Sequence, residues 1–331
     1  SLFIVPKFMV GEDGSLGDRN PVTCGSLEEK MGIHGNATCV MNYDEATGYL
    51  IGKENAGLKA MFVMMNEARL GVGLQGQAMG EIAYQNAVAY ARERLQGRSL
   101  SGPKAPDKKA DPIIVHPDVR RTLMTIRAFN EAGRAFMLWT ALKSDVAHKS
   151  EVESDVQEAD DLLTLVTPVV KGVLTDKGFD HAVMAQQMFG GHGYIEEWGM
   201  SQYVRDARIA MIYEGANGIQ ALDLVGRKLG QNGGRAVMAF FQEVGDFCEE
   251  NRGNEELALY TKSLKKGLND LQASTMWLMQ NAMAKPDNAG AASTDYMHLF
   301  GLVAMGYMWG RMAKVAQEKI AAGANGRSEF M

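Results

Sequence analysis

The feature that most constrains how this chain folds is a helical periodicity that starts near residue 56 and continues almost to the end of the sequence. Apolar residues recur every three or four positions over residues 56–95, which predicts one long helix. A loop rich in proline, lysine and glycine follows at residues 97–112. Two more helices are predicted over residues 117–148 and 154–189, and Pro168 can bend the second of them. Successive long helices of this kind predict a bundle.

Helical patterns also occupy the rest of the chain. A shorter helix is predicted after Glu214, and three more are predicted beyond Gly233, with breaks near residues 251–254 and 285–288. These last three helices form an additional region after the bundle.

The first 55 residues follow a different pattern. Short apolar segments such as residues 2–5 and 38–43 are separated by turn-rich runs, which predicts strands and loops. With only a few strands, the sheet edges and one apolar face would stay uncovered, and we therefore expect the remnant of a larger β domain. The abrupt apolar end at residues 326–331 leads us to expect truncation there as well. The expected fold is mainly α, in three parts: a partial β domain at residues 1–55, a four-helix bundle at residues 56–230 and an appended, truncated helical region at residues 231–331.

Composition narrows the setting and the partners. The net charge of -6 and the lack of a clustered basic surface argue against nucleic acid as a partner. No apolar run reaches the roughly 18 residues of a membrane span, and the N-terminus lacks the basic start and cleavage site of a signal peptide, so we expect a cytoplasmic protein without a membrane partner. The three cysteines include no Cys-x-x-Cys pair, and no metal site is predicted.

A run of glycines at residues 71–76 matches the G-x-G-x-x-G of dinucleotide-binding turns. That fingerprint follows a buried strand, whereas residues 61–70 have a helical pattern. Gly73, Gly76 and Gly80 would lie on one face of the helix, where they let a neighbouring helix approach closely. We therefore interpret them as packing glycines.

The most informative stretch for chemistry spans residues 187–220. Three glycines fall within four positions of FGGHGY (residues 189–194), more than a helix C-cap needs, and such a turn exposes backbone N–H groups to an anionic ligand. Farther on, YEG (residues 213–215) places a carboxylate between an aromatic ring and a glycine. By spacing alone, Glu214 is either a residue of a helix's first turn or a group held for chemistry.

In this order the motifs resemble the C-terminal half of the acyl-CoA dehydrogenases, flavoenzymes that desaturate acyl-CoA thioesters. The resemblance covers most of the chain to about Leu229. It is carried by EEKMGIHGNAT (28–38), YLIGKENAGLKAM (49–61), NEARLGVG (66–73), YARERLQG (90–97) and the stretch at 187–220.

The resemblance implies a role for individual residues. Glu214 matches the family's catalytic base, which removes a proton α to the thioester while a β hydrogen leaves as hydride to flavin. Substrate contacts are implied for Asn66, Arg69, Tyr213 and Gly215. Contacts to FAD, some of them to the flavin of a neighbouring subunit, are implied for Arg94, Gln96, His116, Gln187, Gly190, Gly191, Ala216 and Gly218.

The sequence departs from the family at some of these motifs. Gly97-Arg98 replaces the usual Phe-Gly, and a long loop follows, which affects the adenine end of the flavin site. Pro117 cannot supply a backbone donor. Ala216 stands where Thr is common, so one hydrogen bond to the flavin is expected to be missing.

The resemblance also implies partners and substrates. An electron-transferring flavoprotein is the implied acceptor, and a homodimer or homotetramer the implied assembly. The long loop and the helices after Gly233 resemble the larger members of the family, whose substrates include 3-methylmercaptopropionyl-CoA. Short, medium and long straight-chain acyl-CoAs stay open, because the family forms part of its acyl pocket from an N-terminal half that precedes this sequence.

Two alternatives remain at this point. One is a flavoprotein like the family's alkylation-response members, which have a C-terminal extension and bind DNA; the acidic balance and the lack of a basic run in residues 233–331 weigh against it. The other is a non-catalytic helical oligomerisation module in which Glu214 only starts a helix. His148, His181 and His298 occur singly on predicted helices and receive no role.

Overall fold

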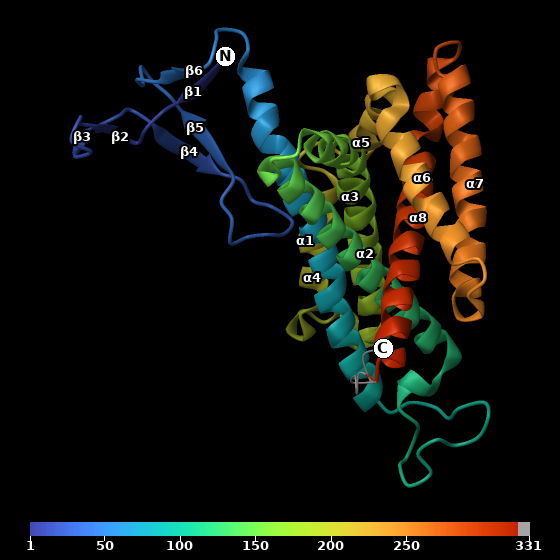
Figure 1. Ribbon diagram of the computed structural model, residues 1–331. Helices are drawn as coiled ribbons and strands as arrows, with labels where there is room; N and C mark the ends of the chain where they lie inside the picture. The colour runs from blue at the N-terminus through green and yellow to red at the C-terminus, as the bar shows by residue number, and fades with distance from the viewer. Residues whose placement is uncertain (324–331) are drawn as a thin grey trace. The chain divides into compact units, whose positions relative to one another are not determined.

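A computed structural model of the chain describes residues 1–323 (Figure 1). The chain forms two compact units, Ser1–Ala68 and Arg69–Met331. The first unit contains three two-stranded antiparallel sheets. They pair β1 (Leu2–Ile4) with β6 (Tyr49–Ile51), β2 (Phe8–Val10) with β3 (Leu16–Arg19), and β4 (Thr23–Leu27) with β5 (Cys39–Asn42). The strands expected at residues 2–5 and 38–43 are confirmed, and β2, β3, β4 and β6 lie in segments for which no specific strand is predicted.

Within this unit, Asn20 holds distant loops together. Its side chain is buried, donates to the carbonyls of Pro6 and Thr47 at 2.8 Å each, and accepts from the Thr47 N–H at 2.9 Å. Large apolar side chains on the strands remain exposed, among them Leu16 and Leu27. The small sheets thus bury little apolar surface of their own.

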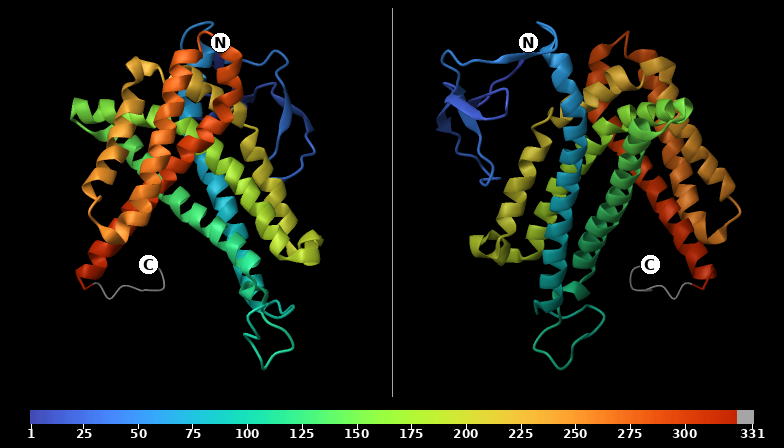
Figure 2. Two further views of the ribbon diagram at one scale, coloured as in Figure 1. Left: turned by 90° about the vertical axis from the view of Figure 1, so that its right-hand side faces the viewer. Right: turned by 60° about the vertical axis from the view of Figure 1, so that its left-hand side comes forward.

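The second unit is helical. Helix α1 (Gly57–Glu93) begins in the first unit and belongs to the second unit from Arg69 onward. The other helices of the second unit are α2 (Pro117–Lys149), α3 (Glu153–Met188), α4 (Met200–Arg208), α5 (Asn217–Asp223), α6 (Arg235–Glu250), α7 (Ala258–Asn281) and α8 (Pro286–Ala321) (Figures 1 and 2). The three long helices expected at 56–95, 117–148 and 154–189 are confirmed to within two residues at each end. The three helices beyond Gly233 are confirmed as well.

Local sequence explains several helix ends. Pro117 and Pro286 stand at the first positions of α2 and α8, where a missing N–H costs no hydrogen bond. The Asn254 side chain accepts from the N–H groups of Glu256 and Leu257 and caps the turn that leads into α7. α3 continues through Pro168 as one helix.

The glycine run in α1 is helical, as predicted, and it packs against α3. A Cβ atom on Gly73 would lie 2.7 Å from Val170 Cγ1, and one on Gly76 would lie 2.6 Å from Thr175 Cα. From the other side, a Cβ atom on Gly178 would lie 2.1 Å from the Gly76 carbonyl oxygen. The backbones of α1 and α3 are therefore in direct contact.

One buried apolar cluster joins the bundle to the C-terminal helices. It includes Phe136 of α2, Leu174 of α3, Phe240 of α6, and Met297 and Phe300 of α8. The rings of Phe240 and Phe300 stack with centroids 4.7 Å apart. α6 to α8 thus share a core with α2 and α3, and the fold is the expected mainly α bundle with a small β part and added helices.

Candidate active site

Glu214 lies in a turn that precedes α5. α5 begins at Asn217 with Ala216 as its N-cap, so the Glu214 carboxylate is outside the first turn of the helix. The backbone is left-handed at two consecutive residues, with φ of 55° at Glu214 and 88° at Gly215. Positive φ is uncommon for a residue other than glycine, and it persists only where the surroundings impose it. The helix-start interpretation of Glu214 is therefore wrong.

Three buried side chains hold this turn through its carbonyl oxygens. Gln220 Nε2 donates to the carbonyls of Glu214 and Gly215, at 3.2 and 3.1 Å. Arg69 Nε donates to the Glu214 carbonyl at 3.4 Å, and Lys171 Nζ donates to the Gly215 carbonyl at 2.8 Å. These hydrogen bonds hold the two peptide planes that flank Gly215, the first of which directly follows Glu214.

Gly215 has two reasons to be glycine. Its φ is left-handed, and a Cβ atom would lie 2.5 Å from Gln220 Nε2. The side chain of Glu214 is half-buried, while Ala216 and Gly218 are exposed. Glu214 is thus partly accessible to solvent, and Ala216 and Gly218 more so.

The sequence-predicted substrate residues have different surroundings. Arg69 is buried and forms an ion pair with Asp223, with 3.7 Å between Nη1 and Oδ2, beside its bond to the Glu214 carbonyl. Tyr213 is half-buried, and its hydroxyl donates to Gln75 Oε1 in α1. Burial and the neighbouring Glu214 charge raise the Tyr213 pKa, which keeps the hydroxyl protonated. Asn66 is exposed and belongs to the first unit.

Sequence reasoning missed a polar network beneath this turn. Asn217 Oδ1 accepts from Lys171 Nζ at 2.7 Å, and Asn217 Nδ2 donates to Thr175 Oγ1 at 2.9 Å and to Asp176 Oδ1 at 2.6 Å. The second oxygen of Asp176 accepts from His298 Nε2 of α8 at 2.9 Å. Burial lowers the Lys171 pKa to about 8. The only signal in the sequence was a lysine within an otherwise apolar helical run.

A second group of predicted residues gathers at the end of α1. Gln96 accepts at its carbonyl from His116 Nε2, at 2.9 Å, and the Arg94 carbonyl accepts from the Ile113 N–H at 2.8 Å. The side chains of Arg94 and Gln96 are exposed and His116 is half-buried. Three residues expected to contact the cofactor are thus brought together.

The loop that follows Gln96 is organised by one carboxylate. Asp111 is buried and accepts from the N–H groups of Ser99, Lys104 and Ala105, at 2.9, 2.9 and 2.7 Å. Arg98 Nη1 also donates to it at 3.2 Å. These bonds, led by the one from Ser99, lower the Asp111 pKa to about 2. Arg98, where the sequence departs from the family motif, therefore has a structural role.

The glycine turn after α3 is fixed at one end and open at the other. A Cβ atom on Gly193 would lie 2.3 Å from the Gln186 carbonyl, whereas one on Gly190 or Gly191 would have no heavy atom within 4 Å. Gly190 is left-handed, with φ of 57°. The predicted residues Gln187, Gly190 and Gly191 are exposed. Open backbone of this kind can approach a bulky ligand.

Aromatic contacts join this turn to α1. The ring of Tyr90 stacks on Phe189 with centroids 4.2 Å apart, and its hydroxyl lies 2.9 Å from His192 Nδ1. His192 in turn stacks on Trp198 at 4.5 Å. The turn therefore lies at the same end of α1 as Arg94.

The two groups are far apart within one chain. Arg69 of α1 contacts the Glu214 turn, and Tyr90 of α1 contacts the turn after α3. At 1.5 Å per residue these positions are about 30 Å apart along the helix axis. A ligand at Glu214 would have to be of that length to contact both groups of the same chain.

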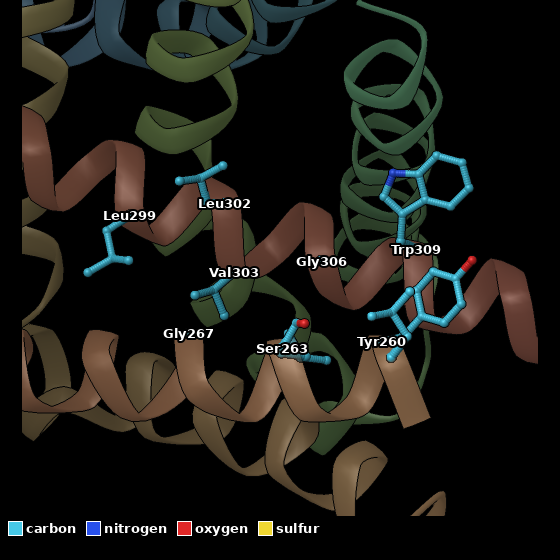
Figure 3. A pocket seen from close by; sticks show the side chains of 10 residues that line it. Tyr260, Ser263, Gly267, Leu299, Leu302, Val303, Gly306 and Trp309 are labelled. Atoms are coloured by element: carbon cyan, nitrogen blue, oxygen red, sulfur yellow. The ribbon is translucent and has the colours of Figure 1, made fainter. Parts of the chain in front are cut away.

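An apolar groove lies elsewhere, between α7 and α8 (Figure 3). It encloses about 550 Å³ and is lined by Leu259, Tyr260, Ser263, Leu264, Gly267, Leu299, Leu302, Val303, Gly306 and Trp309. The indole Nε1 of Trp309 donates to the Ala128 carbonyl in α2, at 2.9 Å. None of the sequence-predicted site residues lines this groove.

Residues 1–323 contain neither a metal-binding cluster of side chains nor a helix suited to cross a membrane. No group of three or more His, Cys, Asp or Glu side chains is placed to hold a metal ion. No helix in this part of the chain combines the length and apolar character that crossing a bilayer requires.

The sequence matches two family models. Residues 55–229 match the acyl-CoA dehydrogenase C-terminal domain, and residues 240–331 match the domain described as acetyl-CoA dehydrogenase C-terminal like. The chain is 42% identical to the 3-methylmercaptopropionyl-CoA dehydrogenase of Ruegeria pomeroyi, over 100% of this chain and 55% of the relative. It is 35% identical to the broad-specificity linear acyl-CoA dehydrogenase FadE5 of Mycobacterium tuberculosis, over 98% of this chain and 55% of the relative. The chain therefore spans about half the length of these curated relatives.

Solved structures share the fold. ACDH-11 of Caenorhabditis elegans, in complex with C11-CoA, superposes with a TM-score of 0.75 at 17% identity, over 91% of this chain and 51% of that one. An acyl-CoA dehydrogenase from Bacillus anthracis, complexed with FAD, gives a TM-score of 0.68 at 19% identity, over 92% and 51%. At these identities the likeness concerns the fold alone.

Proposed function

This chain belongs to the acyl-CoA dehydrogenase family, and on that premise we propose that the protein desaturates an acyl-CoA thioester with Glu214 as the catalytic base. The observation that carries the proposal is the left-handed backbone at Glu214 and Gly215, held by Arg69, Lys171 and Gln220. A residue other than glycine that is held in the left-handed region costs free energy, on the order of 1–3 kcal/mol, and Glu214 is such a residue. Strained residues of this kind cluster at functional sites, which supports a catalytic role for the half-buried Glu214.

The chemistry asked of Glu214 is the removal of one proton. The Cα–H bond of the acyl group breaks and its proton passes to a carboxylate oxygen of Glu214. The Cβ–H bond breaks with its electron pair, and the electrons of the Cα–H bond form the new double bond. FAD, when bound, supplies the two-electron oxidation by accepting the β hydrogen as hydride.

The proposed FAD residues suit a large anionic cofactor. Arg94 brings a positive charge, and the open backbone of Gly190 and Gly191 lets a phosphate approach closely. We assign them to FAD binding together with Gln96, His116 and Gln187, and with Ala216 and Gly218 near the base. Ala216 has no hydroxyl, so it cannot donate a side-chain hydrogen bond.

The distance along α1 supports a site shared between subunits. Ala216 and Gly218 are next to Glu214, whereas Arg94 lies near the far end of α1. We propose that one flavin meets the Glu214 end of one subunit and the Arg94 end of another, in a homodimer or homotetramer. An electron-transferring flavoprotein is proposed as the acceptor on family resemblance.

We propose 3-methylmercaptopropionyl-CoA as the substrate, since the 42% identical relative that carries this name matches the whole chain. Tyr213, Gly215 and Asn66 are proposed to contact it. Arg69 already binds Asp223 and the Glu214 carbonyl, so it would act on the substrate through the turn.

The test compares two glutamates in the flavin-loaded protein. Glu214→Gln keeps the shape and removes the base, and Glu197→Gln makes the same change at an exposed position. We expect Glu214→Gln to lose at least about a hundredfold in turnover while keeping its flavin, and Glu197→Gln to keep both. Turnover of Glu214→Gln at the wild-type rate would refute the assignment.

The substrate is tested separately with pentanoyl-CoA, in which a methylene replaces the sulfur of the methylmercaptopropionyl chain. A clearly higher kcat/KM for the sulfur compound is expected. Equal values would overturn the proposed substrate and leave the proposed reaction standing.

A further inference from the structure

Resting on the proposed function, we infer that Lys171 is a positioning residue that aims the Glu214 carboxylate at the substrate's α carbon. Lys171 lies in α3 within a continuous run of buried residues and has no exposed surface. Within residues 1–323 it is the one buried lysine. An amine in such a place is costly unless it is fully hydrogen-bonded, so its partners indicate what it is for.

Both hydrogen-bond partners of the amine lie just after Glu214, one in its turn and one at the start of α5. Nζ donates to the Gly215 carbonyl at 2.8 Å and to Asn217 Oδ1 at 2.7 Å. Neither partner is a carboxylate, so these contacts are not an ion pair that joins two helices. They connect α3 to the residues immediately after Glu214.

The geometry of the turn explains why this connection matters. With φ of 55° and 88°, Glu214 and Gly215 lie in a region that other backbone conformations readily replace. The Gly215 carbonyl fixes one end of this pair, and the Glu214 carbonyl, held by Arg69 and Gln220, fixes the middle. Both peptide planes that flank Gly215 are held in this way, and one of them is the plane that follows Glu214. Holding that plane restricts the direction of the Glu214 Cα–Cβ bond, and with it the position of the carboxylate.

We call the two hydrogen bonds of Lys171 Nζ, to Gly215 and Asn217, the clamp; residues of α3 and α8 hold it in place. Asn217 Nδ2 donates to the Gly172 carbonyl, Thr175 Oγ1 and Asp176 Oδ1 of α3, at 3.1, 2.9 and 2.6 Å. His298 of α8 holds the other oxygen of Asp176 at 2.9 Å. Asp176, Arg69 and Glu214 are the charged groups that act on Lys171. Helix α8 of the C-terminal region is thereby connected to the proposed catalytic turn.

A direct chemical role for Lys171 is excluded by its position. Its amine has no solvent-exposed surface and lies behind the turn, so it does not touch the reacting carbons. Its effect on the reaction would come from placement, and a displacement of about 1 Å in a reacting group can lower a rate a hundredfold.

The experiment isolates proton abstraction from the rest of the reaction. Methylthioacetyl-CoA has sulfur in place of the β carbon, so an α proton can leave but no hydride can. The flavin-loaded protein is incubated with it in D2O, and deuterium uptake at the α carbon is followed by mass spectrometry. Binding of the same thioester is measured by titration. Four variants are compared with the wild type: Lys171→Met, Asn217→Ala, Glu214→Gln and Lys177→Met.

The expected pattern separates placement from folding and from binding. Lys171→Met should lower the exchange rate about ten- to a hundredfold, with the dissociation constant changed less than threefold. Asn217→Ala, which leaves the amine and its bond to Gly215, should lose less. Lys177→Met changes a half-buried lysine of the same helix that pairs with Asp180, and it should exchange like the wild type.

Each contrary result has a distinct meaning. Wild-type exchange in Glu214→Gln would refute the proposed function itself. Loss of exchange in Glu214→Gln with rates within twofold of wild type in Lys171→Met would overturn the inference about Lys171 alone. An equal loss in Lys177→Met would also overturn it, because the effect would then be general to α3. If Lys171→Met does not fold, Asn217→Ala decides: unchanged exchange refutes the clamp.

Discussion

The contact between α1 and α3 leaves no room for a methyl group at Gly178, which makes Gly178→Ala a sharp test of the packing. The added Cβ would lie 2.1 Å from the Gly76 carbonyl oxygen and 2.7 Å from the Gly76 carbonyl carbon, where ordinary contact begins at 3.4 Å. Both obstacles are backbone, so the helices must separate by about 1 Å or more.

The cost follows from two opposing effects. Overpacking costs about 1–3 kcal/mol, and a rigid backbone obstacle places this site at the upper end. Alanine in a helix interior regains about 1 kcal/mol over glycine. We therefore expect Gly178→Ala to lower the free energy of unfolding by about 2 kcal/mol.

Gly71→Ala is the matched control. Gly71 lies in α1, and a Cβ atom there would meet no heavy atom within 4 Å. This variant should gain about 0.5–1 kcal/mol from helix propensity alone. Urea unfolding followed by circular dichroism measures both changes. A Gly178→Ala protein as stable as the wild type would show that the two backbones are not in contact.

Two further predictions concern pH and subunit sharing. Burial lowers the His181 pKa from 6.5 to about 4, so the contribution of the neutral imidazole to stability is present above pH 6.5 and is lost as pH falls through 4. Relative to His181→Leu, the free energy of unfolding of the wild type in urea should fall by up to about 3 kcal/mol between pH 7 and 4. Parallel pH dependences for the two proteins would contradict this. Mixing inactive Glu214→Gln and Arg94→Ala subunits after dissociation should restore about a quarter of wild-type activity, because about half of the dimers are mixed and each of these has one intact shared site of two. A mixture that stays inactive would mean that both residues serve a flavin within one chain.

The sequence predicted the long helices because their signals are local. Pro117 and Pro286 mark helix starts, and apolar periodicity sets the lengths of α1 to α3. α4 was missed since it has only 9 residues and is flanked by short 3-10 turns. The strands β2, β3, β4 and β6 were not predicted individually, because β2 and β6 have only three residues each and β3 and β4 contain glycine and polar residues that weaken the strand signal.

Only the part of the candidate site that lies within one short sequence motif could be predicted from the sequence. The motif YEG pointed to Glu214, but the residues that hold its turn come from distant parts of the chain. Lys171 meets Asn217, and Asp176 meets His298, only through folding, with nothing in the sequence to pair them. The same holds for Arg69 and Asp223, which form a buried ion pair. Such partners follow from helix packing, which single-sequence patterns do not specify.

The most direct test of the central claim is anaerobic rapid mixing of the flavin-loaded protein with 3-methylmercaptopropionyl-CoA, followed by flavin absorbance. No external acceptor takes part, so bleaching reports only abstraction of the α proton and transfer of the β hydride. We expect rapid bleaching in the wild type and in Glu197→Gln, and a rate at least about a hundredfold lower in Glu214→Gln at equal flavin content. Bleaching of Glu214→Gln at the wild-type rate would contradict the account.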